Sequence, residues 1–466
     1  MPALKSLADN RQLPAAFSVV GVARTELSDE DFQKRMREAV DEPSPAWDSL
    51  VTGFRYIAGD YAHPDTFVAL ERVLDEVDKA RGTGGNRVYY LATVPTVFAE
   101  VAGALAAAGL NRPAHDDAFV RIVIEKPYGR DLQSALDLDA AVHAAFDESQ
   151  VYRIDHYLGK ETVQNVLALR FANAVYEPIW NRRYIDHVQV TVAESLGVGH
   201  RGGFYESAGA LRDIVQNHVL QVLALTLMEP PATIDAQGIR DEKVKALRAV
   251  DVMTAEEVAA NVVRGQYDPG WVEGDQVIGY RQEEGVSPYS TTETYVAMRL
   301  KVDNWRWAGV PIYVRTGKRL PKRVTEVAMT FHRVPHLPFS AAEAQALEPN
   351  ALVLRVQPDE GITLRFGAKV PGQAFRVRTV SMDFSYGAAF LEETPDAYER
   401  LLLDAMVGDP TLFIRTDEVE QAWRIVDPIL EAWADDAPLA RYQAGAWGPA
   451  EADRLIEADG RHWRTP

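Results

Sequence analysis

The 466-residue sequence contains no cysteine. A chain without cysteine has no disulfide framework, no thiolate metal site and no cysteine nucleophile. It also has no stretch near the roughly 18 uninterrupted apolar residues that span a membrane as a helix. Its first residues, MPALKSLADN, lack the basic and apolar regions of a secretory signal. We therefore expect a cytoplasmic protein that does not bind membranes.

Positive charge is scarce as well. The chain has 49 Lys and Arg against 68 Asp and Glu, which gives a net charge of −19. This is the wrong sign for a protein that gains affinity by neutralising nucleic-acid phosphates. Nucleic acid is therefore not an expected partner, and an anionic ligand has to meet a local cluster of basic side chains.

From residue 17 to about 157, apolar runs rich in β-branched residues alternate with amphipathic runs. The predicted strands are AFSVVGVAR, RVYYLAT, FVRIVIEKP and VYRIDHY. Strands that are apolar throughout and separated by helices indicate a parallel sheet covered on both faces. Residues 1–155 are therefore predicted to form a doubly wound, Rossmann-like α/β domain. This domain is incomplete at its start, because MPALKSLADNRQLP carries apolar residues at helical spacing where a strand and a glycine turn should stand.

After about residue 185 the pattern changes. The segments HVQVTVAES, YVAMRLKV, ITLRFGAKV and FRVRTVSMDF alternate apolar with polar residues. This period is typical of antiparallel strands that bury one face. Two helical stretches, ALRDIVQNHVLQVLALTLM and AYERLLLDAMV, can cover that face. Residues 156–466 are therefore predicted to form an α+β domain with a large, mainly antiparallel sheet.

Two motifs match the sequence patterns of known ligand sites but lack the flanking strand or helix that those sites require. GVGHRG, over 197–202, matches the dinucleotide pattern, but the strand before it alternates and no clear acidic residue follows about 20 positions on. HRVPH has the spacing of a helical metal pair, but Pro335 forbids an ordinary helix interior there. We predict neither a cofactor loop at the first motif nor a metal site at the second.

Polar side chains follow the strands of the first domain. Arg24 ends the second strand of the doubly wound pattern, with no acid before Glu26. This position faces the adenosine ribose, where an arginine suits the 2′-phosphate of NADP. A solvated arginine at a strand end explains the residue equally well. Lys126 also follows a buried strand, and Pro127 after it predicts a fixed turn, with a cis peptide bond as one alternative.

The segment RIDHYLGKE crowds polar groups into one strand-to-helix turn. A helix N-terminus binds phosphate readily, and His156, Tyr157 and Lys160 would add hydrogen-bond donors. Asp155 points to the other side of the extended segment and is available to orient another group. The alternative is a surface turn in which Asp155 and His156 satisfy each other.

A histidine in ALRDIVQNHVLQVLAL completes the candidate site. His218 lies among apolar residues at helical spacing, so it should be buried. A buried histidine is more often a hydrogen-bonded core residue than a catalyst. With a carboxylate beside it, however, it becomes a general base suited to neutral pH.

The chain contains the motifs RIDHYLGKE, RDIVQNH, EKPYG and VPIYVRTGKRLPKR. In their order and spacing they resemble the glucose-6-phosphate dehydrogenase family over nearly the whole chain. The resemblance implies oxidation of glucose 6-phosphate at C1 to 6-phosphogluconolactone, the first step of the pentose phosphate pathway. It implies NADP as the hydride acceptor, no metal, and a homodimer or homotetramer assembled through the second domain.

The resemblance also implies residue roles. His218 would be the base and Asp155 its carboxylate partner. The other assignments are phosphate binding by His156, Tyr157 and Lys160, sugar contacts by Glu194, Asp213, Lys318 and Arg323, and cofactor contacts by Arg24, Pro95 and Lys126. The family has lysine at the position of Arg323 and usually two prolines where this chain has Val94 and Pro95.

Members of this family begin with a strand and a Gly-x-x-Gly-Asp-Leu turn that cradles the cofactor pyrophosphate. MPALKSL aligns with the helix after that turn. We expect that the natural chain is longer and that the start was placed at an internal methionine. The alternative is a non-catalytic sugar-phosphate-binding or regulatory protein that has lost the dinucleotide loop, and saturable NADP binding distinguishes the two.

Overall fold

The computed structural model of the protein describes residues 1–338, 347–372, 375–390, 395–434 and 437–466. The chain divides into two compact units, neither of which is continuous in sequence. The first unit comprises Met1–Gly159, Thr233–Arg240 and Pro395–Glu420, and the second comprises Lys160–Ala232, Asp241–Thr394 and Gln421–Pro466.

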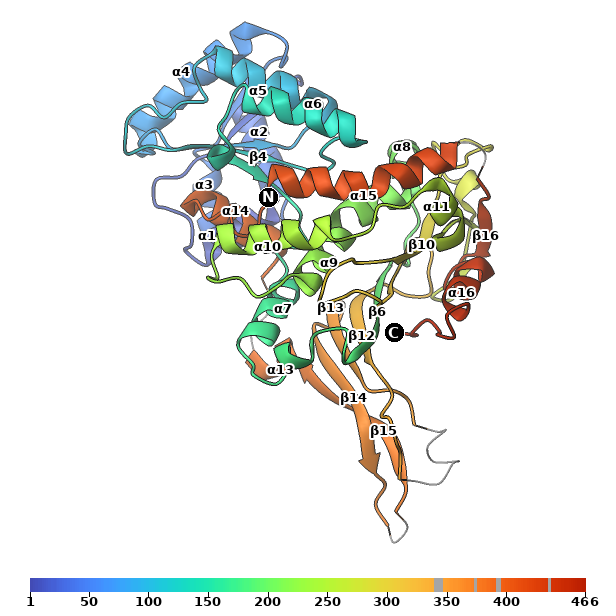
Figure 1. The fold of residues 1–466 in the computed structure, drawn as a ribbon. Helices are drawn as coiled ribbons and strands as arrows, with labels where there is room; N and C mark the ends of the chain where they lie inside the picture. Colours follow the sequence, from blue (N-terminus) through green and yellow to red (C-terminus); the bar gives the residue numbers. More distant parts are fainter. Residues whose placement is uncertain (339–346, 373–374, 391–394, 435–436) are drawn as a thin grey trace. The chain divides into compact units, whose positions relative to one another are not determined.

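The first unit alternates strands with helices, as its sequence predicts, and residues 45–81 contain a strand and two helices that the sequence analysis missed. Its elements include β1 (Val20–Ala23), α2 (Asp29–Glu38), α3 (Pro45–Val51), β2 (Arg55–Ala58), α4 (Pro64–Arg81), β3 (Arg87–Leu91), η1 (Pro95–Val97), α5 (Phe98–Ala107), β4 (Val120–Ile124), α6 (Leu132–His143), η2 (Glu148–Gln150) and β5 (Val151–Arg153). All of these strand pairs are parallel. Helices α4, α5 and α6 lie side by side (Figure 1), as in a Rossmann-like fold.

The parallel strands of this unit form two sheets, although the sequence predicts one. β1 pairs with β2, and β3, β4 and β5 form the other sheet. Within the described residues, the hydrogen-bonded ladder is interrupted between β1 and β3, and every residue of β1 is only half-buried. The unit begins with helix α1 (Pro2–Asp9), as the apolar spacing predicts. Leu4 and Leu7 of α1 join a core cluster that includes residues of α14 (Ala397–Val407).

The second unit is built on a nine-stranded sheet with the order β15-β14-β13-β12-β6-β11-β10-β7-β16. The strands are β6 (Ile185–Ala193), β7 (Val262–Asp268), β10 (Tyr295–Leu300), β11 (Ile312–Gly317), β12 (Val324–Phe331), β13 (Ala351–Gln357), β14 (Gly361–Lys369), β15 (Val377–Ser385) and β16 (Ala440–Gln443). Among the described strands of this sheet, only the pairs β6–β11 and β7–β16 are parallel. The predicted large, mainly antiparallel sheet is therefore present, with β14 and β15 as a long hairpin (Figure 1).

Strand β6 departs from its alternating sequence, because its polar side chains are buried too. Gln189 donates to the carbonyl of His462 at 3.0 Å and accepts from the N–H of Arg464 at 2.8 Å. Thr191 accepts from Arg315 at 3.0 Å. The prediction of one exposed face is wrong for this strand, because the C-terminal segment covers it and satisfies its polar groups.

The helices of the second unit are mostly short. They include α7 (Glu161–Phe171), η3 (Glu177–Ile179), η4 (Gly199–Arg201), α8 (Gly202–Ala210), η5 (Leu211–Val219), α9 (Leu220–Leu227), α11 (Ala255–Asn261), η6 (Tyr280–Gln282), α13 (Tyr386–Phe390) and α16 (Ala450–Glu457). A small hairpin, β8 (Gly270–Val272) and β9 (Asp275–Val277), also belongs here. Helices α10 (Ala236–Arg248) and α15 (Thr416–Ala434) contribute residues to both units. Every residue of α9 is buried, so this helix is a central element of the unit.

Arg170 joins the C-terminal ends of α7 and α9. Its guanidinium donates to the carbonyls of Leu225 at 2.9 Å and Met228 at 2.7 Å, and to the carboxylate of Glu177 at 3.1 Å. Carbonyls at a helix end have no partner within the helix. Arg170 is 1% exposed, so it satisfies these carbonyls where water does not reach.

Replacing this buried cation should destabilise the second unit. We expect Arg170→Met to lower the free energy of unfolding by about 3–5 kcal/mol, because the substitution leaves the carbonyls of Leu225 and Met228 without their donor. Among the described residues, it also leaves the buried side of Glu177 with Arg306 alone, at 2.9 Å. Urea denaturation measures the change. The matched control is Arg72→Met, since Arg72 is exposed and lies 3.9 Å from Glu76. An equal loss in both variants would contradict this role for Arg170.

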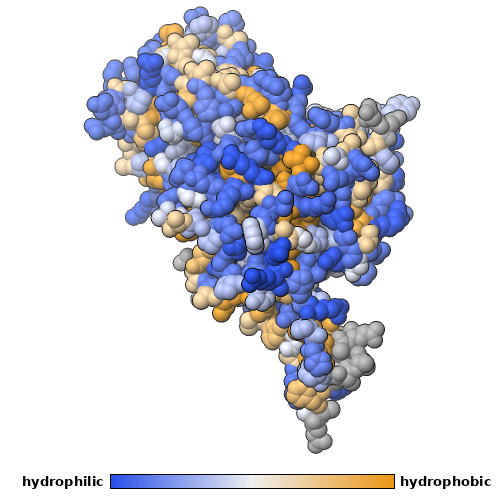
Figure 2. Space-filling view, viewed as in Figure 1, coloured by the Kyte–Doolittle hydropathy of each residue, from blue (hydrophilic) through white to orange (hydrophobic). Residues whose placement is uncertain are grey.

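The viewed face of the molecule is mainly hydrophilic (Figure 2), in keeping with the 25% of charged residues. Among the described residues, the structure has no helix that is both long enough and apolar enough to cross a bilayer.

Candidate active site

In the first unit, polar residues follow the carboxyl ends of neighbouring strands. Lys126 and Pro127 come two and three residues after β4, and the peptide bond between them is cis. The fixed turn predicted there is confirmed. The N–H of Ile154 donates to the carbonyl of Ile124 at 3.0 Å, so the segment after β5 leaves the sheet beside the segment after β4. Ligands of open α/β sheets bind outside this edge.

The turn after β5 is buried and internally hydrogen-bonded. A carboxylate oxygen of Asp155 accepts from the N–H of Tyr157 at 2.9 Å, and its carbonyl accepts from the N–H of Leu158 at 3.0 Å. Asp155 is 1% exposed and Tyr157 is 5% exposed, so the alternative of a surface turn is wrong. The ring of His156 stacks on that of Tyr398 with centroids 6.1 Å apart. Tyr398 belongs to α14, and the sequence contained no signal that it would lie here.

The predicted cofactor residues of this unit are more accessible. Arg24 directly follows β1 and is exposed, and Pro95 is the half-buried first residue of η1. Within the described part of its unit, Arg24 makes no ion pair. Its guanidinium is therefore available to a ligand at the carboxyl end of β1.

In the second unit, Asp213 and His218 lie on η5, which is a nine-residue π-helix. The sequence predicts an ordinary α-helix here, because nine residues are too few for the apolar spacing to distinguish the two periods. His218 is 1% exposed and Asp213 is half-buried. The prediction of a buried histidine is confirmed. Stretches of π-helix are rare and occur frequently at functional sites.

Glu194 and Lys318 come together across two strand ends. Each is the first residue after a strand, and β6 and β11 are parallel neighbours with Ala193 opposite Gly317. The ammonium of Lys318 donates to a carboxylate oxygen of Glu194 at 2.6 Å. It also lies 5.0 Å from the ring centroid of Tyr205. This pair offers one cation and one carboxylate to a ligand that carries several hydroxyl groups.

A second pair of cations converges on Gln357, at the end of β13. Its side-chain oxygen accepts from Lys160 at 2.5 Å and from Arg323 at 3.2 Å, and its amide donates to Thr325 at 3.0 Å. Lys160 is the N-cap residue of α7. The structure therefore brings Lys160 and Arg323 together through a glutamine that the sequence analysis missed. Its position far along the chain gave no local signal.

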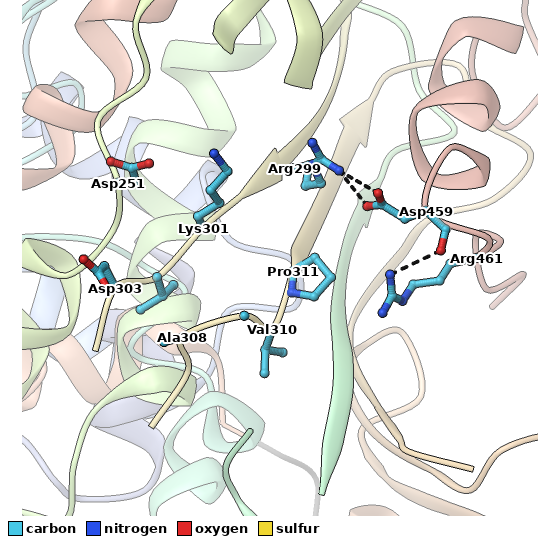
Figure 3. A pocket seen from close by; sticks show the side chains of 11 residues that line it. Asp251, Arg299, Lys301, Asp303, Ala308, Val310, Pro311, Asp459 and Arg461 are labelled. Atoms are coloured by element: carbon cyan, nitrogen blue, oxygen red, sulfur yellow. Dashed lines mark hydrogen bonds and ion pairs between the residues drawn. The ribbon is translucent and has the colours of Figure 1, made fainter. Parts of the chain in front are cut away.

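A separate pocket of about 500 Å³ lies in the second unit (Figure 3). Its charged side chains include Arg299, which binds Asp459 at 2.7 Å, and Arg461, which binds Asp186 at 2.9 Å. None of the predicted site residues lines this pocket. Because its arginines are already paired within the chain, the candidate residues remain those at the strand ends of each unit and those on the π-helix of the second unit.

Comparisons with known proteins identify the family of the chain. The sequence matches the family described as glucose-6-phosphate dehydrogenase, NAD binding domain, over residues 1–165, and the C-terminal domain of the same family over residues 167–464. It is 51% identical to glucose-6-phosphate 1-dehydrogenase 2 of Mycobacterium tuberculosis, with 100% of this chain and 91% of the relative covered. It is 49% identical to glucose-6-phosphate 1-dehydrogenase of Aggregatibacter actinomycetemcomitans, with 100% and 94% covered.

Solved structures show the same similarity. A glucose-6-phosphate dehydrogenase in complex with its substrate glucose-6-phosphate superposes with a TM-score of 0.90 at 33% identity, over 100% of this chain and 95% of that chain. The glucose-6-phosphate 1-dehydrogenase from Mycobacterium avium gives a TM-score of 0.83 at 38% identity, with the same coverage. The chain belongs to the glucose-6-phosphate dehydrogenase family.

Proposed function

We propose that the protein oxidises glucose 6-phosphate at C1 to 6-phosphogluconolactone and transfers the hydride to NADP. The observation that carries this proposal is the similarity, at a TM-score of 0.90, to a dehydrogenase in complex with glucose-6-phosphate. The residues expected to contact the sugar phosphate are present, and Lys318 and Glu194 already form a pair. Residues 1–155 would bind the dinucleotide and residues 156–466 would bind the substrate.

The phosphate of the substrate would be held by His156, Tyr157 and Lys160. Lys160 stands at the N-terminus of α7, where free N–H groups and the helix dipole favour an anion. Charge-assisted hydrogen bonds from these donors supply the local positive site that a chain with a net charge of −19 requires.

The sugar ring would be positioned by Glu194, Asp213, Lys318 and Arg323. A carboxylate accepts hydrogen bonds from sugar hydroxyls, whereas a lysine or arginine donates to their oxygens. Holding the substrate through its distant phosphate and its hydroxyls orients C1 before reaction. These contacts would therefore increase turnover as well as affinity.

Proton removal is assigned to His218. Its imidazole would take the proton of the C1 hydroxyl while hydride leaves C1 with its electron pair, so that C1 becomes the lactone carbonyl. Asp155 would orient the imidazole and stabilise its protonated form. The nicotinamide ring supplies the hydride acceptor when the cofactor is bound.

The residues at the carboxyl ends of the parallel strands fit a nicotinamide dinucleotide. A family described as NAD binding matches this region, and ligands of such folds lie at these strand ends. Lys126 would stand between substrate and nicotinamide, and Pro95 would lie on the cofactor side. We assign the 2′-phosphate of NADP to Arg24, which is exposed directly after β1.

A kinetic comparison tests this assignment. We expect Arg24→Ala to raise KM for NADP about 10- to 100-fold, as loss of a charge-assisted hydrogen bond does, and to leave KM for NAD unchanged. Arg35→Ala is the control, since Arg35 is exposed on α2. Equal changes for both dinucleotides would contradict the role of Arg24.

The assembly is proposed to be a homodimer or homotetramer formed through the large sheet. β15 is an edge strand of that sheet, with Met382 and Phe384 exposed at 57% and 36%. An edge strand with exposed apolar side chains is a site where a second chain can dock. Sedimentation of the purified chain measures the subunit number.

The proposed reaction is tested directly by following NADPH formation from glucose 6-phosphate. Turnover would support the enzyme. Glucose 6-phosphate binding without turnover and without saturable NADP binding would favour the non-catalytic alternative.

A further inference from the structure

The π-helix that carries Asp213 and His218 begins at an unusual backbone turn. Gly209 has φ 65° and ψ 175°, a conformation that is essentially restricted to glycine. A Cβ at this position would lie 2.2 Å from a carboxylate oxygen of Glu293. Glycine is therefore required both for the backbone conformation and for the close approach of Glu293.

Glu293 holds the start of this helix through two contacts. Its carboxylate accepts from the N–H of Leu211 at 3.0 Å, and its carbonyl accepts from the N–H of Ala210 at 3.0 Å. N–H groups at a helix N-terminus have no partner within the helix, and a carboxylate there is favourable. Glu293 is 5% exposed. Burial raises the pKa of its carboxyl group, whereas the hydrogen bond from Leu211 opposes that shift.

The residue after Glu293 holds the opposite side of the candidate site. The carbonyl of Thr294 accepts from the N–H of Lys318 at 3.0 Å. The hydroxyl of Tyr442 donates to the carbonyl of Lys318 at 2.7 Å and lies 3.1 Å from the hydroxyl of Thr294. The dipeptide Glu293-Thr294 therefore contacts both the helix that bears His218 and the strand end that bears Lys318.

We propose that Glu293 is a positioning residue for the dehydrogenase reaction. By binding the first N–H of the π-helix, its side chain sets where Asp213 and His218 stand relative to Lys318. The role depends on the reach of the side chain and on an acceptor atom at its end. This inference rests on the proposed function, because it assumes that these three residues act on one substrate.

Three substitutions of Glu293 distinguish the effect of side-chain length from the effect of its charge. Glu293→Gln keeps both the length and an acceptor oxygen, so kcat and KM should stay within about threefold of the parent. Glu293→Asp keeps the charge but is one methylene too short, and Glu293→Leu removes the acceptor. We expect these two variants to lower kcat about 10²-fold, the effect of displacing a catalytic group by about 1 Å.

Further readouts distinguish positioning from a general loss of fold. In Glu293→Asp and Glu293→Leu, KM and the calorimetric Kd for glucose 6-phosphate should rise while KM for NADP stays unchanged. Thermal unfolding of each variant identifies any that fails to fold, and Glu293→Asp, the milder of these two changes, remains informative if Glu293→Leu fails to fold. The inference is overturned if Glu293→Asp matches the parent, or if Glu293→Gln is as impaired as Glu293→Leu.

The parent chain in the same assays separates this inference from the proposed function. If the parent binds glucose 6-phosphate without turnover, the proposed reaction fails, and the Kd values of the variants still test the placement of Lys318 and Asp213. If the parent neither turns over nor binds glucose 6-phosphate, both proposals are overturned.

Discussion

His218→Asn should lower kcat by about 10²- to 10⁴-fold, the usual contribution of a positioned general base. The asparagine side chain is polar and compact, but it cannot take the proton of the C1 hydroxyl. KM for glucose 6-phosphate should change little, because the phosphate and ring contacts are assigned to other residues. Initial rates of NADPH formation measure the effect.

A second histidine provides the control for this substitution. His63 is exposed in the first unit, and His63→Asn should keep the parent's rate. Because His218 is buried, thermal unfolding has to show that His218→Asn is folded. A folded variant that keeps more than about a tenth of kcat would contradict the assignment of His218 as the base.

The second large effect is expected from Lys160→Met. Its ammonium stands at the N-terminus of α7, and loss of its charge-assisted hydrogen bond should lower kcat/KM for glucose 6-phosphate by about 10- to 100-fold. Glucose itself lacks the phosphate, so kcat/KM for glucose should be unchanged. The ratio of the two values measures how much discrimination Lys160 provides.

Lys245→Met is the matched control for this variant, because Lys245 is exposed and pairs only with Glu242, at 2.9 Å, among the described residues. It should leave both kcat/KM values unchanged. If Lys160→Met lowered the values for glucose and glucose 6-phosphate equally, Lys160 would have a general structural role, and the phosphate assignment would be wrong.

Local sequence patterns were sufficient to predict the structure wherever it depends on residues that are neighbours along the chain. Ser28 and Asp31, three residues apart in the sequence, form a capping box at the start of α2, with the N–H of Asp31 donating to the Ser28 hydroxyl at 3.1 Å. Four strands of the first unit, β1, β3, β4 and β5, also lie where their apolar sequences predict, whereas β2 was missed. A helix cap is satisfied within a few residues, and an apolar β-branched run identifies a strand by its own composition, so short segments contain the necessary information.

Contacts between distant residues could not be predicted from such patterns. Glu194 meets Lys318 because β6 and β11 are parallel neighbours, and Lys160 meets Arg323 through Gln357, at the end of β13. Strand order and register depend on which ladders form across the whole sheet. The sequence named these residues through family resemblance, but not the contacts that unite them.

The sequence by itself determined the two kinds of architecture, the strand-to-helix turn at Asp155 and the fixed turn at Pro127, because hydrophobic periodicity and turn chemistry act over short distances. Only the tertiary structure decided the split of the parallel sheet, the burial of β6 beneath the C-terminal segment, and the π-helix held by Glu293. These features depend on which distant groups satisfy a backbone N–H or a polar side chain. That choice is made by packing and not by spacing along the chain.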